Sequence, residues 1–469
     1  MPPKKGNSSK KSKGISFHHE FQKPTSAQRK DALGHFPCTS IASNISRREM
    51  LKRSAQVQPS LQARTIECKT RGEQKVPMAL SDLNDKRLFI PTPRSETTFA
   101  TPLPIDELDW LAQVPEEGQA YDDYLRLLTT KTTGRIKPLA NAEGIDILLL
   151  PIVRSCDGSQ WPEHGPPLQK LVDYTRIFFD RPVHLLPAAK LDVSRIGEAS
   201  FKKRRKIASN KPGAFASAFK REFTLKLPID EENYQASVKI AGRADATTDR
   251  IQLQVESLLD ELSSFRYGRH DKNEKDFCIM GITLEDLYDG PSDLFCAGMA
   301  FGGDKVAVFS FARYHPLVKM HPEKWWHYGY GKESDGYSYY EDHDENPVGL
   351  SEAPPVIASH QKQMKSEFLR RSCKLLTHEL GHLYALDHCI HNRCLMMGTG
   401  HLVEDFRAPT HLCGICLRKL CWRTGFDVIM RYKLLAGVFE NIGLGKESKW
   451  AKKQYDALKN AERCNHRNR

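Results

Sequence analysis

The sequence predicts an α/β fold with a mixed, twisted sheet, a helix that carries a metal-binding motif, and a cysteine-rich C-terminal part. Three observations lead to this prediction. Apolar runs of strand length alternate with segments of helical periodicity from residue 145 onward. A pentapeptide with two histidines four residues apart follows them. Five of the 12 cysteines then fall between Cys389 and Cys421.

The first half of the fold is predicted as strands that alternate with helices, which is typical of a mainly parallel sheet. The apolar run 145–152 and the segment 183–186 are predicted strands, and a helix is predicted between them over 168–179. A further strand is predicted over 223–227. The apolar positions of 251–265 fit one helix face, so this segment is predicted as a helix.

The second half begins with a strong predicted strand over 277–282. Strands over 296–301 and 305–311 follow, and Gly302-Gly303-Asp304 between them is typical of a tight reversal. Such a hairpin makes one strand antiparallel to the rest. We expect 296–301 to lie at the edge of the sheet, where its free backbone groups can pair with an extended peptide.

The segment from His378 to His382 reads HELGH. Histidines at i and i+4 share one helix face and can bind one metal ion, with Glu379 beside that face. His388 can complete a site of three nitrogens if the chain leaves the helix and folds back. Three protein ligands on zinc leave a fourth position for water, which is the catalytic arrangement. The alternative for the pentapeptide alone is an ordinary amphipathic helix with exposed polar residues.

Four cysteines after these histidines predict a second metal site. A C-x-x-C pair and two further cysteines suit a closed, tetrahedral structural zinc site. The predicted ligands are Cys389, Cys394, Cys413 and Cys416. The sequence therefore predicts two zinc ions per chain. The nearest substitute ligands are Cys421, His391 and His411.

The segment from His378 to Cys416 resembles the archaemetzincin family. That family's pattern is H-E-x-x-H-x-x-G-x-x-H-C, then C-x-M, then C-x-x-C, and this chain has HELGHLYALDHC, CLM and CGIC. The family's glycine is replaced by Ala385, and the last spacer is about one residue shorter. If the left-handed conformation of that glycine is kept, an alanine costs about 1–2 kcal/mol. A weaker resemblance extends over roughly residues 143 to 440 and includes Arg313.

The resemblance implies a metzincin-like zincin fold and a zinc-dependent endo- or aminopeptidase that acts on peptides or proteins. It implies that Glu379 is the general base, and that the histidines bind the catalytic zinc. Met396 is implied to form a methionine turn that packs beneath the metal, with Met397 as the alternative occupant. The cysteine site would fix this turn to a C-terminal subdomain. The strand 296–301 would border the cleft and pair with substrate.

Composition and charge divide the chain further. Residues 1–75 hold 16 Lys and Arg against 5 Asp and Glu, which accounts for nearly all of the net charge of +12. Such a polar segment cannot bury enough surface to fold. The predicted units are a disordered basic arm (1–75), a variable N-terminal extension (76–142), a catalytic domain (143–442, with inserts at about 188–222 and 316–361) and a polar C-terminal tail (443–469).

Several segments permit two interpretations. The aromatic insert 316–361 either packs on itself or forms a lid beside the cleft. The run 202–206, KKRRK, is either an exposed insert or a nuclear localisation signal. The basic arm is either solvated or makes weak contact with nucleic acid. A helix is predicted over 426–442, and 446–462 is a polar helix or a frayed tail.

Neither a signal peptide nor a membrane-spanning run is recognisable, so we expect reduced thiols and a cytoplasmic or nuclear location, or both. A monomer without membrane contact is expected. Two other functions stay open at this point. One is a nuclear zinc protease acting on DNA-bound protein, and the other is a catalytically silent interaction protein stabilised by zinc.

Overall fold

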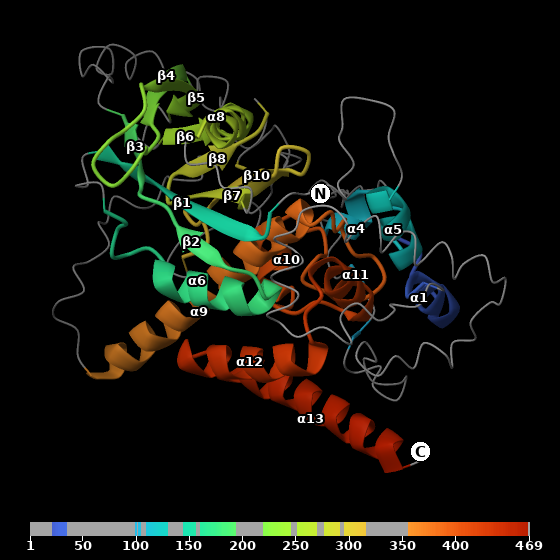
Figure 1. Cartoon of the computed structure of the whole chain (residues 1–469). Coiled ribbons are helices and arrows are strands. Elements are labelled where there is room, and N and C mark those ends of the chain that lie inside the picture. Colours follow the sequence, from blue (N-terminus) through green and yellow to red (C-terminus); the bar gives the residue numbers. More distant parts are fainter. Residues whose placement is uncertain are drawn as a thin grey trace, which may run out of the picture.

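The computed structural model describes residues 21–34, 99–100, 102–104, 109–129, 144–155, 160–193, 219–244, 251–269, 276–290, 295–315 and 355–467 (Figure 1). Residues 1–20 and 35–75 of the basic arm, the KKRRK run at 202–206 and residues 316–354 of the predicted lid lie outside these residues. Within the described parts, no helix is long and apolar enough to cross a bilayer.

One large mixed sheet organises the described residues. Its strands follow the order β8-β6-β5-β4-β3-β1-β7-β10-β9, and β2 pairs with β1 in addition. Their bounds are Asp146–Arg154 (β1), Val183–Leu185 (β2), Ala189–Asp192 (β3), Phe219–Lys226 (β4), Val238–Ala244 (β5), Ile251–Gln254 (β6), Asp276–Thr283 (β7), Asp286–Tyr288 (β8), Gly298–Phe301 (β9) and Val306–Ser310 (β10).

The centre of the sheet is parallel and its flanks are largely antiparallel. Strand β1 runs parallel to β2, β3 and β7, and β10 runs parallel to β7. Strands β3, β4, β5 and β6 form antiparallel pairs in succession, and β9 pairs antiparallel with β10. The predicted α/β class with a mixed sheet is therefore confirmed, although the first half is less parallel than alternating strands and helices suggested.

The sheet curls until its two ends approach each other. Leu287 in β8 forms an antiparallel bridge with Cys296, which lies two residues before β9. Helix α8 (Val255–Gly268) packs on one face of the curled sheet, as Figure 1 shows next to β6 and β8. Alternate residues of β1, such as Leu148 and Leu150, face α8 and belong to an apolar core with Leu258, Leu259 and Leu262.

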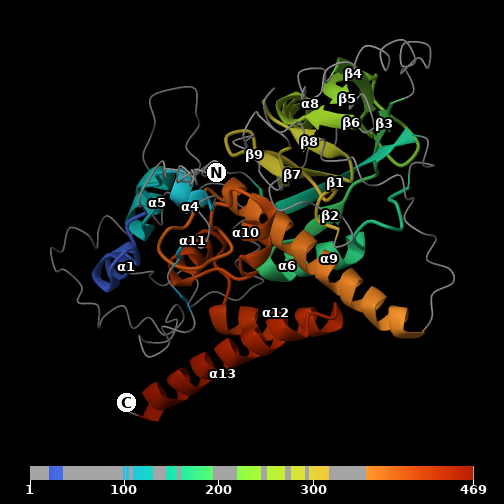
Figure 2. The ribbon, with the colours of Figure 1, turned by 180° about the vertical axis from the view of Figure 1, so that it is seen from behind.

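Several helices lie on the side of the opposite face and build a second core. They include α6 (Leu168–Phe179), α9 (Pro355–Leu383), α12 (Val428–Asn441) and α13 (Gly445–Arg467), which lie below the sheet in Figures 1 and 2. Helices α6 and α9 pack against the strands, and α12 packs against α6. The other residues of β1, Ile147 and Leu149, point into this core. Helices α10 (Leu402–Arg407) and α11 (Gly414–Thr424) complete it beyond the end of α9. The polar tail is thus a helix whose buried Leu458 belongs to the core.

Part of the predicted basic arm is folded, which corrects the prediction that residues 1–75 are disordered throughout, and the extension 76–142 contains helices as well. Helix α1 (Ser26–Ala32) begins with a capping box in which Thr25 and Gln28 exchange hydrogen bonds. Helices α4 (Trp110–Gln113) and α5 (Tyr121–Thr129) follow. Buried residues of α1 and α5 belong to the same core as α9. A charge count over 75 residues cannot detect so short a capped helix.

The predicted helix over 251–265 is wrong at its start. Residues Ile251–Gln254 form strand β6, which pairs with β5 and β8, and the helix begins only at Val255. Ile251 and Leu253 fit a strand period as well as a helix face, so the apolar pattern alone could not separate the two. The side chain of Gln254 accepts a hydrogen bond from the Ser257 N–H and caps the helix. Strands β3, β5 and β8 were not predicted.

A series of buried hydrogen bonds links polar side chains at the place where the two ends of the sheet meet. Arg313 donates to both carboxylate oxygens of Asp286, at 2.9 and 2.5 Å. Gln252 donates to the same carboxylate at 2.7 Å and accepts from Arg243 at 2.6 Å. Arg313 and Asp286 are 5% and 9% exposed, so the pair is almost fully withdrawn from water. A desolvated carboxylate requires such partners.

We expect Arg313→Leu to lower the free energy of unfolding by about 3 kcal/mol, because it leaves the buried Asp286 carboxylate without its bidentate partner. Urea denaturation monitored by circular dichroism measures the change. Arg154→Leu is the matched control, since Arg154 pairs with the neighbouring Glu285 but is 34% exposed. That variant should lose less than about 1 kcal/mol. Equal losses in the two variants would contradict a special role for the buried pair.

Candidate metal centre

Helix α9 presents two histidines of the HELGH motif on one face near its C-terminal end. His378 and His382 lie one turn apart, and their Nε2 atoms are 3.1 Å from each other. The helix packs against β9 and β10 on one side and α6 on the other, and its buried Leu376, Leu380 and Leu383 hold it in the core. The motif is therefore fixed to the rigid part of the fold.

A left-handed turn ends α9 and sends the chain back toward the two histidines. Ala385 has φ +63°, and its N–H bonds to the carbonyl of His382 at 2.8 Å. The N–H of Leu386 bonds to the carbonyl of Gly381 at 3.0 Å. These two bonds form a Schellman motif, which usually has glycine at the left-handed position. The chain thus keeps the glycine conformation with an alanine.

The turn brings His388 to the histidine pair. Its ring centroid lies 5.0 Å from that of His382 and 5.6 Å from that of His378. One nitrogen from each of the three rings lies within 4.8 Å of the other two. The structure therefore brings together the three histidines predicted as ligands of one metal.

Hydrogen bonds at the three Nδ1 atoms fix the orientation of the rings. His378 Nδ1 lies 2.9 Å from the carbonyl of Leu395, and His382 Nδ1 lies 2.8 Å from that of Leu386. His388 Nδ1 lies 2.7 Å from Oε1 of Glu116. Because carbonyl and carboxylate oxygens only accept, each Nδ1 carries the proton. Each Nε2 then offers a lone pair to the common centre, which is how metal-binding histidines are held.

These residues fit a zinc ion. Tetrahedral zinc with nitrogens at 2.0–2.1 Å separates its ligand atoms by about 3.3 Å, close to the Nε2 separation of His378 and His382. Burial, reinforced by His388, lowers the pKa of His378 to about 4. Burial also places the pKa of His382 well below its ordinary value. Both imidazoles are therefore neutral at pH 7, which is the form that binds a metal.

Glu379 lies beside the histidine pair and is buried. Burial, with a smaller contribution from the nearby Asp405, raises the pKa of Glu379 to about 8. Asp405 itself forms an ion pair with Lys374 at 2.9 Å. Lys374 lies in α9, one helical turn before His378. A cation at the three histidines would oppose the shift and favour the ionised form of Glu379.

The segment after His388 passes beneath the helix. Met396 is fully buried, and a Cβ atom built on Gly381 would meet its sulfur at 2.5 Å, so Met396 packs directly against the helix between the histidines. The carbonyl of Met396 accepts the N–H of Cys389 at 2.6 Å. Met397 is 9% exposed. Of the two methionines considered from the sequence, Met396 is thus the one in contact with the motif helix at Gly381.

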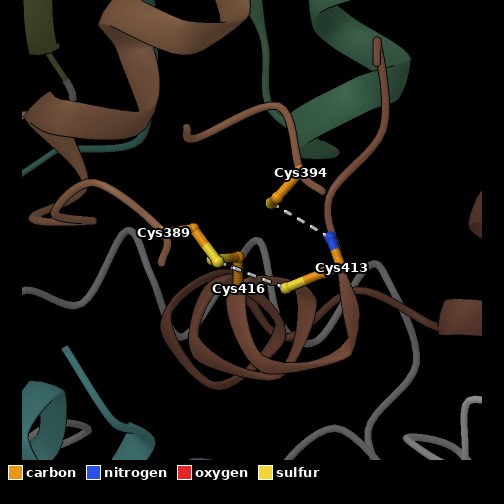
Figure 3. A group of neighbouring side chains, drawn as sticks. All are labelled: Cys389, Cys394, Cys413 and Cys416. Carbon is orange, nitrogen blue, oxygen red and sulfur yellow. Dashed lines mark hydrogen bonds between the residues drawn. The ribbon is translucent and has the colours of Figure 1, made fainter. Parts of the chain in front are cut away.

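Four buried cysteines form a second cluster next to this segment, and Figure 3 shows their side chains directed toward one another. Their sulfur atoms lie within 4.8 Å of one another. The sulfurs of Cys389 and Cys413 are 3.7 Å apart, close to the separation of about 3.8 Å for thiolates on tetrahedral zinc. The cluster consists of the four predicted cysteines, Cys389, Cys394, Cys413 and Cys416.

The surroundings of the cluster favour thiolate at Cys413 and Cys389, whose pKa values are lowered, and the protonated thiol at Cys394 and Cys416, whose pKa values are raised. Cys413 is the N-cap of α11, whose N-terminal end stabilises negative charge. Burial alone would raise the pKa of the Cys413 thiol, but hydrogen bonds from the other three cysteines hold it well below its ordinary value. The backbone N–H of Cys413 also donates to Cys394 sulfur at 3.1 Å. A metal cation enclosed by the four sulfur atoms would neutralise the negative charge of the thiolates and suits this set of donors.

The residues considered as substitute ligands have other surroundings. Cys421 donates to the carbonyl of Phe426 at 3.3 Å near the end of α11. His411 stacks on Trp450 with ring centroids 3.9 Å apart, and burial lowers its pKa to about 3. His391 packs near Gly118. None of these three residues therefore takes the place of a cysteine in the cluster.

A third group of possible ligands was not predicted. Asp109, His401 and Glu404 are buried and close together. His401 accepts the Glu404 N–H through Nδ1 at 3.3 Å and therefore donates to Asp109 through Nε2 at 2.9 Å. Arg407 also donates to Asp109. Because both nitrogens of His401 are used, this group joins the N-terminal segment to α10 rather than offering a metal site.

No motif in the sequence marks Glu116 as a residue of the site. It lies 272 positions from its partner His388, in a segment without a recognisable motif. Burial alone would raise the pKa of Glu116, but the hydrogen bonds from His388 and Trp110 bring it below its ordinary value. Only the tertiary structure places this carboxylate at the histidine site.

The region that contains both groups of candidate ligands matches a known protein family. Residues 351–421 match the family model described as "Peptidase family M54". Archaemetzincin-2 of Rattus norvegicus is 31% identical over 293 residues, which cover 61% of this chain and 74% of that protein. Archaemetzincin-2 of Homo sapiens is 35% identical over 221 residues, 45% of this chain and 53% of the relative. The chain thus spans only about half the length of several of its curated relatives.

Solved structures are similar at lower identity. The crystal structure of archaemetzincin from Methanopyrus kandleri is 19% identical, with a TM-score of 0.29, and the match covers 62% of this chain and 98% of that one. A zinc-dependent peptidase from Methanocorpusculum labreanum is 16% identical, with a TM-score of 0.30, and the match covers 58% and 99%.

Ala385→Gly should raise the free energy of unfolding by about 1 kcal/mol, because glycine adopts the left-handed conformation without the steric cost of a Cβ atom. Thermal or urea denaturation measures the gain. The matched control is Ala457→Gly in the middle of α13, where the same change should cost about 1 kcal/mol. Destabilisation of similar size at both positions would show that Ala385 is not strained.

Proposed function

We propose that this chain, which belongs to the archaemetzincin family, is a zinc metallopeptidase that hydrolyses peptide bonds at the histidine site. The observation that carries the proposal is the geometry of the three rings. His378, His382 and His388 turn their Nε2 lone pairs to one centre while each Nδ1 is engaged. Three nitrogen ligands leave a position open for water or substrate.

Each group of ligands is proposed to hold one zinc ion, so that the chain binds two. The three histidines form an open site, and the four cysteines form a closed one. The two sites share a short stretch of chain, since His388 and Cys389 are adjacent. The cysteine site is therefore proposed to fix the segment that carries the third histidine and Met396.

Zinc at the histidine site supplies Lewis acidity, which makes water more acidic and polarises a peptide carbonyl. Glu379 is proposed to be the general base that takes a proton from the attacking water and passes it to the leaving amine. Its buried position one residue after His378 supports this role. Met396 is proposed to support the histidines by packing against Gly381, and not to bind the metal.

Strand β9 is proposed to bind an extended substrate. It ends the sheet path, its residues Gly298–Phe301 are only half-buried, and it lies next to α9. An edge strand offers free backbone groups to a peptide, which adds to the sheet as another strand. Such pairing serves an endopeptidase or an aminopeptidase equally, and the products from a long peptide distinguish the two.

Glu379→Gln should reduce peptide hydrolysis by several orders of magnitude and leave metal content unchanged, because a base is removed but no ligand. His388→Ala should lose activity together with one zinc ion. The measurements are turnover of a peptide that the wild type cleaves, and zinc by elemental analysis. Turnover of Glu379→Gln near the wild-type level would disprove the assignment of the base.

The second prediction concerns the number of metal ions. Elemental analysis of the wild type should give two zinc ions per chain, and a chelator should remove the ion of the open histidine site first. Replacing both Cys413 and Cys416 by serine should remove the more slowly released ion. A single zinc ion in the wild type that persists in this double variant would contradict the cysteine site.

A further inference from the structure

The segment from Asp109 to Gln119 crosses the outside of the histidine site, and we call it the N-terminal strap. It precedes the catalytic motif by more than 250 residues in the sequence. Figure 1 shows α4, which lies in the strap, beside α10 and α11. Glu116 lies near the middle of the strap, with its carboxylate 2.7 Å from Nδ1 of His388.

The first end of the strap is fixed to α10. The backbone N–H of Trp110 donates to Glu404 at 2.8 Å, and Asp109 accepts from His401 at 2.9 Å and from Arg407 at 2.5 Å. Asp109 and His401 are 3% and 8% exposed, so water competes little for these bonds. The position of Trp110 is therefore set by the fold.

The second end is fixed to the turn that precedes His388. Gln119 donates to Asp387 at 2.9 Å and to the carbonyl of Ala385 at 3.2 Å. Lys419 of α11, itself buried, donates to the side-chain oxygen of Gln119 at 2.9 Å. Glu116 is thus held between two anchored ends, and a residue so held can fix the position of its own partner.

Trp110 orients the carboxylate of Glu116 and packs beside its partner. Its indole N–H donates to Oε1 of Glu116, the same oxygen that faces His388. The indole meets the His388 ring edge to face, with centroids 5.6 Å apart. It also lies against Gly398, where a Cβ atom would meet the indole at 2.4 Å. The rotation of the His388 ring is therefore restricted by a hydrogen bond and by packing.

Glu116 differs from the acceptors at the other two histidines. His378 and His382 donate to neutral backbone carbonyls, whereas His388 donates to a carboxylate. A negative acceptor makes the imidazole a stronger electron donor at Nε2 and fixes the tautomer that binds a metal. His388 is also the one of the three that lies outside α9, so the helix does not hold it.

We propose that Glu116 is a positioning residue of the histidine site, which orients His388 and strengthens its binding of zinc. This inference rests on the proposed function, because it assumes a zinc ion at the three histidines. It assigns to the N-terminal strap a direct part in forming the metal centre.

The test compares zinc binding by Glu116→Gln, Glu116→Ala and the wild type, all as the full chain. The measured quantity is the zinc affinity of the histidine site, which is the site expected to lose its ion to a chelator first. Glu116→Gln keeps an acceptor but loses the charge, so affinity should fall about 10-fold, and in Glu116→Ala it should fall nearer to 100-fold. Glu117→Gln is the matched control, because the neighbouring Glu117 is exposed and carries the same charge. That variant should bind zinc as the wild type does.

The second zinc ion and thermal unfolding show whether each variant is folded. A variant that keeps the cysteine-bound ion and its melting temperature, but has weakened histidine-site binding, supports the proposal. Affinities within twofold of the wild type in both Glu116 variants would overturn it. Faster peptide hydrolysis in Glu116→Ala would also overturn it, because the strap would then obstruct the site. A wild type without a zinc ion at the histidines would instead refute the proposed function itself.

Discussion

The Nε2 atoms of His378 and His382 lie 3.1 Å apart, and each of the two rings donates through its Nδ1. Two lone pairs therefore face each other at a distance where they repel unless a positive charge lies between them. Several of the described segments around the site hold this arrangement. The helix fixes two rings through its core packing, and the left-handed turn at Ala385 returns the chain so that His388 can join them.

Helix α11 links the cysteine cluster to the histidine site. Cys413 is its N-cap, Cys416 lies in its first turn, and Lys419 in its second turn binds Gln119 next to the turn at Ala385. Arg418 donates to the carbonyls of Leu33 and Gly34 at the end of α1. A metal ion at the cysteines would therefore stabilise the helix that anchors both N-terminal segments, one of which carries Glu116 beside His388.

In several places in this fold, a buried Lys or Arg side chain donates to a carbonyl at the C-terminal end of a helix. Lys305 donates to the carbonyl of Leu383 at the end of α9, at 2.6 Å. Arg181 and Arg431 do the same for Thr424 of α11 and Phe178 of α6. The last carbonyls of a helix lack partners within the helix, and they lie at its negative end. These contacts allow helices to end inside the core, where water cannot solvate the carbonyls.

The sequence by itself determined the elements whose signal is local. Helix α6 agrees with the predicted range 168–179, and β1, β7 and α12 lie close to theirs, because each has an uninterrupted apolar pattern. Four of the proposed ligands also followed from spacing, since i and i+4 on one helix place His378 and His382 together, and a C-x-x-C pair does the same for Cys413 and Cys416. The places of His388, Cys389 and Cys394 depend on how the chain returns to these residues. The structure brings both groups together, although their binding of metal remains a proposal.

Only the tertiary structure decided the rest. Strand β6 needed its partners β5 and β8 to be distinguished from the start of a helix. Helix α1 was not predicted, because the basic composition of the residues around it indicated disorder. Glu116 and Asp109 acquire a role only because the chain returns to His388 and His401 after almost 300 residues. Hydrogen bonds between such distant residues leave no periodicity in the sequence, because nothing local requires either partner.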